Sequence, residues 1–179
     1  MSTSGNIVGG GFLYIGFNRT GIFDVRYQRA ILNISGRLEL MANMQLGAGS
    51  RLVIGKEGVM KIQGNVSNSA GTTIICHDLI VIEDKTVISW DTLITDRDFH
   101  YLLDINTGHT RPEHKPIIIG KGVWICAGSK VLKGASMPDG SVLSAGSILS
   151  RAVEEKNCIL MGNPAVVVKK GIVRSDIEV

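Results

Sequence analysis

The amino-acid sequence predicts a left-handed parallel β-helix, an all-β fold built from six-residue repeats. From Ile119 onward, each hexapeptide has an aliphatic first residue and a small or β-branched fifth residue. The fourth residue is glycine in five successive repeats, at Gly122, Gly128, Gly134, Gly140 and Gly146. Such a repeat forms a short strand with its aliphatic side chain in a narrow core, then a corner where glycine readily adopts a positive φ. A β-sandwich would instead need turns about every 8–12 residues.

The composition agrees with many short strands joined by tight corners. The 179 residues include 22 glycines and are 44% apolar but only 5% aromatic, which suits one core of strands better than long helices. The hexapeptide register continues upstream with slips and fades in the first forty residues. We therefore expect a single domain over residues 1–179, with an N-terminal cap or irregular first coils over 1–40, the β-helix over 41–168 and a tail over 169–179.

Charge and cysteine content exclude several classes of function. The net charge of +3 comes from scattered lysines and arginines, so no nucleic-acid surface is expected. No stretch approaches the roughly 18 apolar residues that span a bilayer, and no signal peptide is apparent, so we expect a cytoplasmic protein without an integral membrane segment. The cysteines, Cys76, Cys126 and Cys158, are widely spaced without a C-x-x-C pair and are expected to be reduced.

One interruption of the repeat predicts a protruding loop. Ile94 and Ile119 are 25 residues apart, one more than four hexapeptides, and the polar sequence TGHTRPEHKP lies between them. Loops of this length on a rigid scaffold often carry function. We expect this one, near residues 104–116, to project from the β-helix.

The segment TDRDFH, just before this loop, contains the residues best suited to acid–base chemistry. Asp96, Asp98 and His100 occupy alternate positions, so in an extended segment their side chains would share one face. A carboxylate could then orient the imidazole, whose ordinary pKa near 6.5 suits a general base. The same spacing also occurs in solvated structural clusters, and the spacing by itself does not separate the two.

Four segments together resemble the hexapeptide-repeat acetyltransferases: SWDTLITDRDFH, PIIIGKGVWICAGSKVLKG, GSVLSAGSILSR and MGNPAVVVKKG. The resemblance covers residues 46–172 and is strongest to the branch that O-acetylates capsular polysaccharide or lipopolysaccharide. It implies a homotrimer with active sites between neighbouring β-helices, acetyl-CoA in the groove and a histidine as general base. His100 occupies the matching position. Asp98 is the candidate that orients it, while Asp96 is the alternative or, with Trp90, a contact to the acceptor.

The resemblance also implies that the later coils bind the cosubstrate acetyl-CoA, and no metal. Small residues would let the pantetheine arm lie against the backbone, and a lysine would supply a positive charge for a phosphate, although Lys169 and Lys170 could also belong to a solvated tail. The sequence departs from the common pattern at Cys126 and Ser144. The residues expected to contact acetyl-CoA are Trp124, Gly128, Ser129, Ala145, Gly146, Asn163, Pro164, Lys169 and Lys170.

These inferences lead to an acetyl-CoA-dependent O-acetyltransferase that modifies a sugar hydroxyl of a surface polysaccharide precursor or related glycan. N-acetylation of an amino-sugar and a non-catalytic binding scaffold remain alternatives. The zinc-dependent γ-type carbonic anhydrases share the fold but need three histidine ligands on the repeat faces, and the repeats after Ile119 contain none. His77 is expected to be an exposed turn residue. His109 and His114 would be either solvated or within reach of a neighbouring subunit's site.

Overall fold

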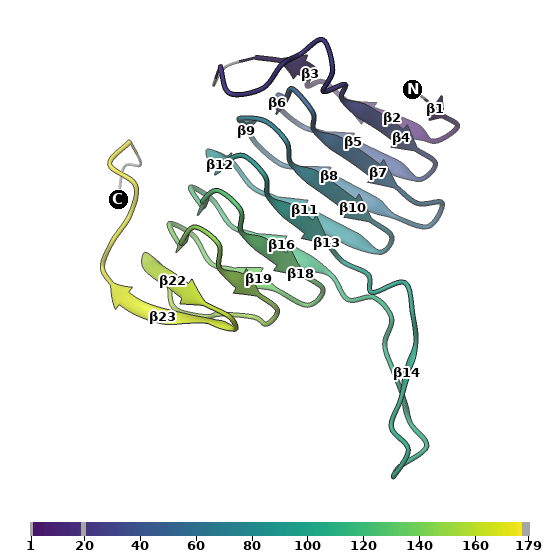
Figure 1. The fold of residues 1–179 in the computed structure, drawn as a ribbon, viewed down its shortest axis with the longest axis vertical. Helices are drawn as coiled ribbons and strands as arrows, with labels where there is room; N and C mark the ends of the chain where they lie inside the picture. The colour runs from purple at the N-terminus through teal and green to yellow at the C-terminus, as the bar shows by residue number, and fades with distance from the viewer. Residues whose placement is uncertain (1, 19–20, 177–179) are drawn as a thin grey trace.

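The computed structural model describes residues 2–18 and 21–176, which form strands, turns and bends without a helix. Successive coils wind into a triangular prism whose three faces are parallel sheets (Figure 1). The predicted left-handed parallel β-helix is confirmed. The described part of the chain accordingly contains no helix capable of crossing a membrane.

Each coil contributes one strand to each face. The first sheet consists of β1 (Ser2–Thr3), β4 (Ile31–Ile34), β7 (Arg51–Ile54), β10 (Thr73–Cys76), β13 (Leu93–Thr95), β18 (Lys130–Leu132) and β21 (Ile148–Leu149). The second sheet consists of β2 (Asn6–Gly9), β5 (Arg37–Leu40), β8 (Val59–Ile62), β11 (Leu79–Ile82), β16 (Ile117–Ile119) and β19 (Ser136–Met137). The third sheet consists of β3 (Leu13–Phe17), β6 (Met44–Gly47), β9 (Val66–Asn68), β12 (Thr86–Ile88), β17 (Trp124–Ile125), β20 (Val142–Leu143), β22 (Cys158–Gly162) and β23 (Ala165–Lys170).

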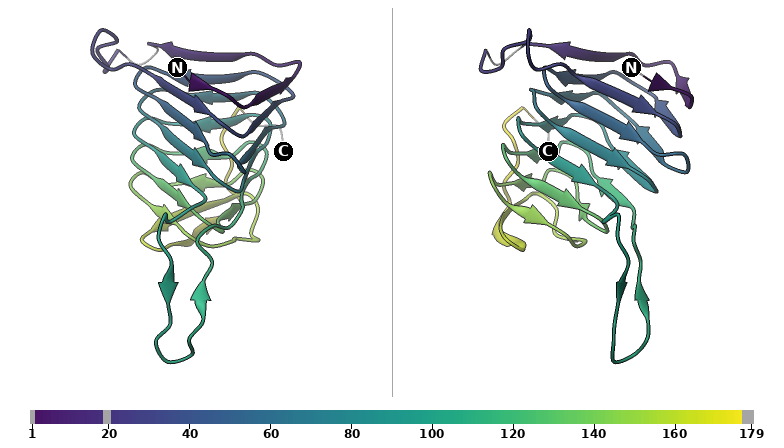
Figure 2. Two further views of the ribbon diagram at one scale, coloured as in Figure 1. Left: turned by 90° about the vertical axis from the view of Figure 1, so that its right-hand side faces the viewer. Right: turned by 45° about the vertical axis from the view of Figure 1, so that its right-hand side comes forward.

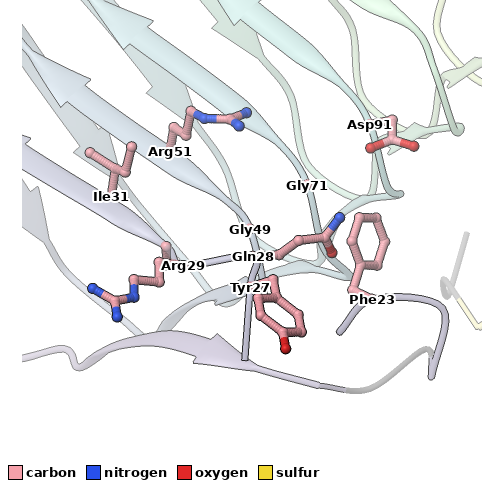
Figure 3. Close-up of a pocket in the computed structure, with 10 residues that line it drawn as sticks. Phe23, Tyr27, Gln28, Arg29, Ile31, Gly49, Arg51, Gly71 and Asp91 are labelled. Carbon is pink, nitrogen blue, oxygen red and sulfur yellow. The ribbon is translucent and has the colours of Figure 1, made fainter. Parts of the chain in front are cut away.

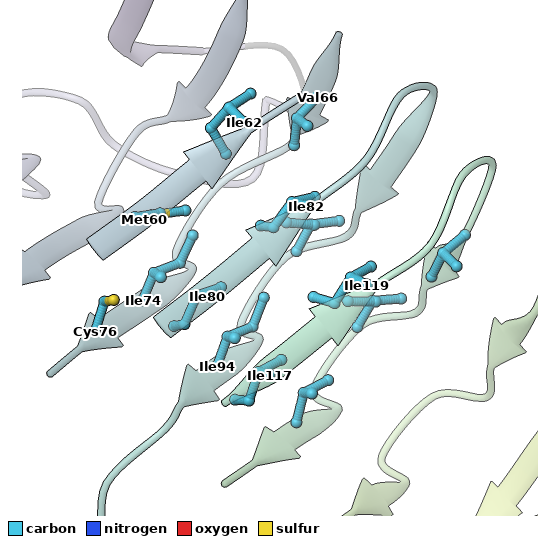
Figure 4. Packing of buried hydrophobic residues seen from close by; sticks show 14 of the residues in the cluster. Met60, Ile62, Val66, Ile74, Cys76, Ile80, Ile82, Ile94, Ile117 and Ile119 are labelled. Atoms are coloured by element: carbon cyan, nitrogen blue, oxygen red, sulfur yellow. The ribbon is translucent and has the colours of Figure 1, made fainter. Parts of the chain in front are cut away.

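The core is a continuous stack of aliphatic side chains inside the prism (Figure 4). On the first sheet, parallel pairing places Leu52, Ile74, Ile94 and Val131 directly above one another, and all four are fully buried. Because each coil buries its apolar residues only against its neighbours, the stability of the fold depends on an unbroken stack.

Ile74→Ala is expected to lower the free energy of unfolding by about 2–5 kcal/mol, because it leaves a cavity in the middle of this stack. Ile75→Ala is the matched control, since Ile75 is the next residue of β10 and faces outward with only partial burial. Urea unfolding of both variants measures the difference. Equal losses for the two variants would contradict the assignment of the inward face.

The repeat glycines adopt the conformation that the sequence predicted for corners. Gly122, Gly128, Gly134, Gly140 and Gly146 all have positive φ, between 67° and 76°. At the corners that connect the third sheet to the first, the same backbone conformation recurs one coil after another, at Gly49, Gly71, Asp91, Gly128 and Gly146. We call this edge of the prism the glycine edge.

Coil strands extend into both segments that the sequence left irregular. Strands β2 and β5 lie within residues 1–40 and pair in parallel register, with Ile7 opposite Leu38. At the other end, β23 turns back antiparallel on β22 and ends at Lys170. Lys169 and Lys170 thus belong to a strand that reaches two residues into the predicted tail.

The predicted loop is confirmed as a hairpin that leaves the prism after β13 and returns before β16. Its arms pair through β14 (Leu102–Leu103) and β15 (Thr110–Arg111), and a separate antiparallel bridge joins Arg97 to His114 nearer the body. The hairpin extends well beyond the prism in both views of Figure 2. It emerges at the edge between the first and second sheets, which is not the glycine edge.

Candidate functional site

His100 lies where the chain leaves the β-helix for the hairpin. Strand β13 ends at Thr95, and Phe99 has a positive φ of 67°, so this segment is not extended. Asp96 is fully buried, whereas Asp98 and His100 are exposed. The expectation that the three side chains share one face is therefore wrong, because it assumed that the strand continues through His100.

The carboxylate of Asp96 closes a corner inside the β-helix. Its two oxygens accept hydrogen bonds from the backbone N–H groups of His77, at 2.8 Å, and Asp78, at 2.9 Å. These bonds satisfy a carboxylate that would otherwise be costly to bury. The structure does not bring Asp96 together with Trp90, because Trp90 precedes β13 and lies on the glycine edge while Asp96 follows β13.

Asp98 forms an ion pair with a lysine. Its Oδ2 lies 2.5 Å from Nζ of Lys133, and its backbone N–H donates to the carbonyl of Glu113 at 3.0 Å. Within residues 2–18 and 21–176, neither ring nitrogen of His100 has a hydrogen-bond partner, so Asp98 does not orient the imidazole in this arrangement. Its orienting role stays a prediction that requires its side chain to leave Lys133.

Three side chains at the base of the hairpin contact one another, and we call them the neck network: His77, Arg97 and Glu113. Arg97 Nε donates to Glu113 Oε1 at 2.6 Å, and Arg97 Nη1 donates to His77 Nδ1 at 3.1 Å. The side chain of Glu113 is only 4% exposed. A carboxylate at such a position is stable when paired with a planar guanidinium.

The neck network contacts both residues that flank His100. The ring of Phe99 packs edge-on against His77, with centroids 5.3 Å apart, and lies 5.5 Å from the guanidinium carbon of Arg97. On the other side, the nearby carboxylate of Glu113 raises the pKa of the Tyr101 hydroxyl. The network thereby fixes the backbone from which the imidazole of His100 projects.

The same contacts set the charge states of the network. Burial and the positive charge of Arg97 lower the pKa of His77. Burial alone would raise the pKa of Glu113, but the hydrogen bonds from Arg97 and Tyr101 outweigh it and hold that pKa below its usual value. At neutral pH the imidazole of His77 is therefore neutral and accepts a hydrogen bond from the guanidinium of Arg97. The same guanidinium pairs with the carboxylate of Glu113.

Stability is expected to fall as pH drops below about 6.5, the pKa of an unperturbed histidine. The pKa of His77 is lowered in the folded state, so the unfolded chain binds more protons in this range and is favoured. His77→Asn retains an acceptor that does not titrate and should flatten this part of the profile, whereas His109→Asn in the exposed hairpin serves as the control. Thermal unfolding from pH 5 to 8 measures both, and parallel profiles for wild type and His77→Asn would contradict the prediction.

The sequence analysis missed His77 as a site residue. It is only half-exposed and hydrogen-bonded, and the expectation of an exposed turn residue was wrong in this respect. Nothing in the spacing of His77, Arg97 and Glu113 indicates that they meet, because the contact depends on the inserted hairpin returning to the corner that it left. The available signal was an arginine before the polar segment and a glutamate within it.

The residues expected to contact acetyl-CoA lie mainly along the glycine edge. The backbone N–H of Gly128 donates to Trp90 and that of Gly146 donates to Ala127, each at 3.0 Å, which stacks these corners directly. No atom lies within 4 Å of the position that a Cβ at Gly146 would occupy, and Ala145 is exposed. The edge here presents open backbone that an extended ligand can approach.

Four further predicted contacts lie on or beside this edge. The indole of Trp124, 37% exposed, donates to Ser89 Oγ at 3.0 Å. Ser129 is fully buried and donates to the carbonyl of Ser144 at 3.0 Å, so its side chain has a structural partner. The exposed Asn163–Pro164 turn joins β22 to β23, and Gly162 beside it donates to Ser147 Oγ at 3.1 Å.

The two C-terminal lysines differ in their surroundings. Lys170 Nζ lies 2.7 Å from Glu155 Oε2, and this ion pair raises the pKa of the lysine. Lys169 is exposed and has no ion pair among the described residues. Of the two, Lys169 is therefore the one whose charge is unpaired.

The exposed histidine and the glycine edge lie on opposite sides of the first sheet. Trp90 and Asp91 precede β13, whereas His100 follows it after the next corner. One chain by itself therefore does not bring His100 to the predicted acetyl-CoA contacts. In the described part of the chain, no group of three or more His, Cys, Asp or Glu side chains could hold a metal ion, and the three cysteines are free.

Comparison with known proteins identifies acetyltransferases. A protein of Escherichia coli strain K12, provisionally named as the lipopolysaccharide biosynthesis O-acetyl transferase WbbJ, is 27% identical over 154 residues, covering 82% of this chain and 78% of its own. A provisionally named yeast acetyltransferase, YJL218W of Saccharomyces cerevisiae, is 38% identical over 100 residues, covering 52% of this chain and 50% of its own. No protein-family model matches the chain.

Solved structures share the fold at low sequence identity. The polySia-specific acetyltransferase NeuO matches with a TM-score of 0.54 and 19% identity, over 98% of this chain and 90% of its own. The hexapeptide-repeat acetyltransferase VCA0836 of Vibrio cholerae, complexed with acetyl coenzyme A, matches with a TM-score of 0.50 and 20% identity, over 62% of this chain and 60% of its own.

The curated relatives are named as acetyltransferases, and the solved structures that share the fold include hexapeptide-repeat acetyltransferases, so the resemblance that the sequence predicted is confirmed. This resemblance is to the branch of O-acetyltransferases that modify capsular polysaccharide and lipopolysaccharide.

Proposed function

We propose that this protein transfers an acetyl group from acetyl-CoA to a hydroxyl group of a sugar, within a surface polysaccharide precursor or related glycan. The observation that carries this proposal is the exposed side chain of His100, which has no hydrogen-bond partner among the described residues and follows Phe99, whose ring packs on the neck network. An unoccupied imidazole on a fixed backbone suits a general base. Acetyl-CoA use and a cytoplasmic location, where this cosubstrate is available, belong to the same proposal.

In this mechanism His100 accepts the proton of the acceptor hydroxyl while that oxygen attacks the thioester carbonyl. The new ester bond forms as the carbon–sulfur bond breaks, and the proton held by His100 passes to the departing sulfur. Backbone N–H groups facing the carbonyl oxygen would stabilise its developing charge. The open backbone at Gly128 and Gly146 would receive the pantetheine arm, and Lys169 would offer its charge to a phosphate.

We further propose that the active enzyme is a homotrimer in which a neighbouring copy completes each site. The separation of His100 from the glycine edge supports this arrangement, because the hairpin of one copy can bring His100 to the glycine edge of the next. An intermolecular site also gives the long hairpin a role that it lacks in an isolated chain.

Titration calorimetry with acetyl-CoA tests the donor half of the proposal. Micromolar binding near one site per chain is the expected result, and Ala145→Trp, which places a large side chain on the open edge, should abolish it. Ala145→Ser is the matched control and should bind normally. A folded protein that neither binds nor hydrolyses acetyl-CoA would exclude the transferase and favour a non-catalytic scaffold.

Mixed oligomers test the shared site. Chains with His100→Ala keep an intact glycine edge, and chains with Ala145→Trp keep an intact His100, so each is inactive alone. Co-expression should restore part of the activity if neighbouring copies form one site. If mixed oligomers of verified composition show no activity, the whole site lies within one chain.

A further inference from the structure

The segment between β3 and β4 forms a second structured element on the glycine edge. Within residues 21–30, which we call the strap, the carbonyl of Gln28 accepts a hydrogen bond from Gly49 at 3.0 Å. The ring of Phe23 lies 3.1 Å from the position of a Cβ at Gly71. Glycine at this corner thus leaves the space in which the strap sits against the β-helix.

The strap and the β-helix enclose a pocket of about 490 Å³ (Figure 3). Its walls combine aromatic rings with charged groups, and the residues on which the argument depends are Phe23, Tyr27, Arg29, Arg51 and Asp91. A pocket of this size accommodates one or two sugar rings, since ligand sites typically start at about 300 Å³.

The positive charges of the pocket are unpaired. Arg29 forms no ion pair among the described residues, and Arg51 makes only a 3.5 Å hydrogen bond from Nη1 to the hydroxyl of Thr73. The lining contains one carboxylate, that of Asp91, which lies across the pocket from Arg29 (Figure 3). Arginine binds carboxylate and phosphate with two parallel hydrogen bonds, so these side chains favour an anionic ligand.

The aromatic residues of the pocket further restrict the class of ligand that it can bind. Tyr27 is 81% exposed although the strap around it is ordered by hydrogen bonds, such as those from the backbone of Tyr27 and Gln28 to the carbonyl of Asp24. The guanidinium carbon of Arg26 lies over this ring, 5.6 Å from its centroid, and the ring still exposes apolar surface with a polar hydroxyl at its edge. Beside two arginines, such a surface suits the ring of a sugar that carries a negative charge.

The pocket lies on the same glycine edge as several of the proposed acetyl-CoA contacts. Asp91 lines the pocket, and its neighbour Trp90 accepts the hydrogen bond from Gly128 that links this corner to the next coil. Asp91 also precedes β13, the strand that leads to His100. A ligand in the pocket therefore lies on the same edge of the prism as the proposed acetyl-CoA contacts, with Asp91 as the part of the lining nearest to them in the stack of coils.

We propose that this pocket binds an anionic sugar unit of the acceptor glycan, with Arg29 and Arg51 facing its charge and Tyr27 facing its ring. The inference rests on the proposed acetyltransferase function and specifies the class of acceptor. The charge can be a carboxylate or a phosphate, and the experiment separates these two sources.

Binding of defined oligosaccharides tests the proposal on the full-length protein. The carboxylated probes are tetragalacturonate and an α2,8-linked sialic acid tetramer, each compared with its carboxyl-reduced form, and mannose 6-phosphate oligosaccharide is the phosphorylated probe. We expect at least one charged probe to bind about tenfold or more tightly than its neutral counterpart, because the neutral probe cannot form the paired hydrogen bonds that arginine makes with an anion.

Arg29→Gln/Arg51→Gln should remove this preference, and Tyr27→Ala should weaken charged and neutral probes alike. The matched control is Arg37→Gln/Lys61→Gln, which removes the same net charge from the second sheet. Acetyl-CoA affinity is measured for every variant and should not change.

The outcomes distinguish the two proposals. If acetyl-CoA binds normally but no charged probe is preferred, or the control loses as much binding as the pocket variant, the anionic acceptor site is wrong and the transferase stands. If the pocket variant loses acetyl-CoA affinity equally, the arginines serve the donor phosphates and the proposal is also wrong. If acetyl-CoA does not bind to the wild-type protein at all, the proposed function itself fails.

Discussion

His100→Ala is expected to reduce kcat for acetyl transfer by about 10²–10⁴-fold, the usual contribution of a general base. The side chain is exposed and has no hydrogen-bond partner among the described residues, so its removal should leave folding, oligomeric state and acetyl-CoA affinity unchanged. Steady-state kinetics and calorimetry on the same preparation measure these quantities together.

A matched variant distinguishes the base from its surroundings. His109→Ala removes another exposed hairpin histidine and should retain activity close to wild type. Turnover near the wild-type rate in a folded His100→Ala protein would remove this residue from the mechanism. A comparable loss in His109→Ala would instead indicate that the hairpin as a whole, rather than one imidazole, is required.

Glu113→Gln is expected to lower kcat by up to about 10²-fold without changing acetyl-CoA affinity, because a small displacement of a catalytic group is sufficient for such a loss. The substitution keeps the size of the side chain but removes the charge that pairs with Arg97 and that raises the pKa of Tyr101. The backbone that carries His100 would then lose one of its two supports.

The pH dependence of kcat separates positioning from simple destabilisation. If Glu113 positions the base, the variant should retain the wild-type pH optimum of kcat with a lower plateau. Asp104→Asn, at the hairpin turn where Asp104 accepts from backbone N–H groups at 2.9 and 3.2 Å, is the control for general loosening of the hairpin. Equal losses in the two variants would argue against a specific role for the neck network.

The fold could be predicted from the sequence because its determinants are local and repeated. Each glycine of the repeat sits at a corner with positive φ, and each aliphatic first position faces the core. The 25-residue gap between Ile94 and Ile119 identified the protruding hairpin for the same reason, since it departs from an otherwise regular register.

The details of the site could not be predicted because they depend on where strands end and on contacts between distant residues. The D-x-D-x-H spacing carries no sign that β13 stops at Thr95, so the inward turn of Asp96 was not visible. The pairing of Asp98 with Lys133 likewise joins residues from two coils separated by the hairpin. The strap pocket was missed because its aromatic and basic residues lie in a segment without hexapeptide register.

The hairpin leaves and re-enters the β-helix at one corner without disturbing the coils on either side. Strand β13 still pairs with β18 and β11 with β16, in uninterrupted parallel register. The number of residues in the excursion is therefore free to change without cost to the coil pairing, since surface insertions carry only a small entropic penalty. Evolution or a protein engineer could therefore lengthen, shorten or exchange this segment while the prism keeps its stability.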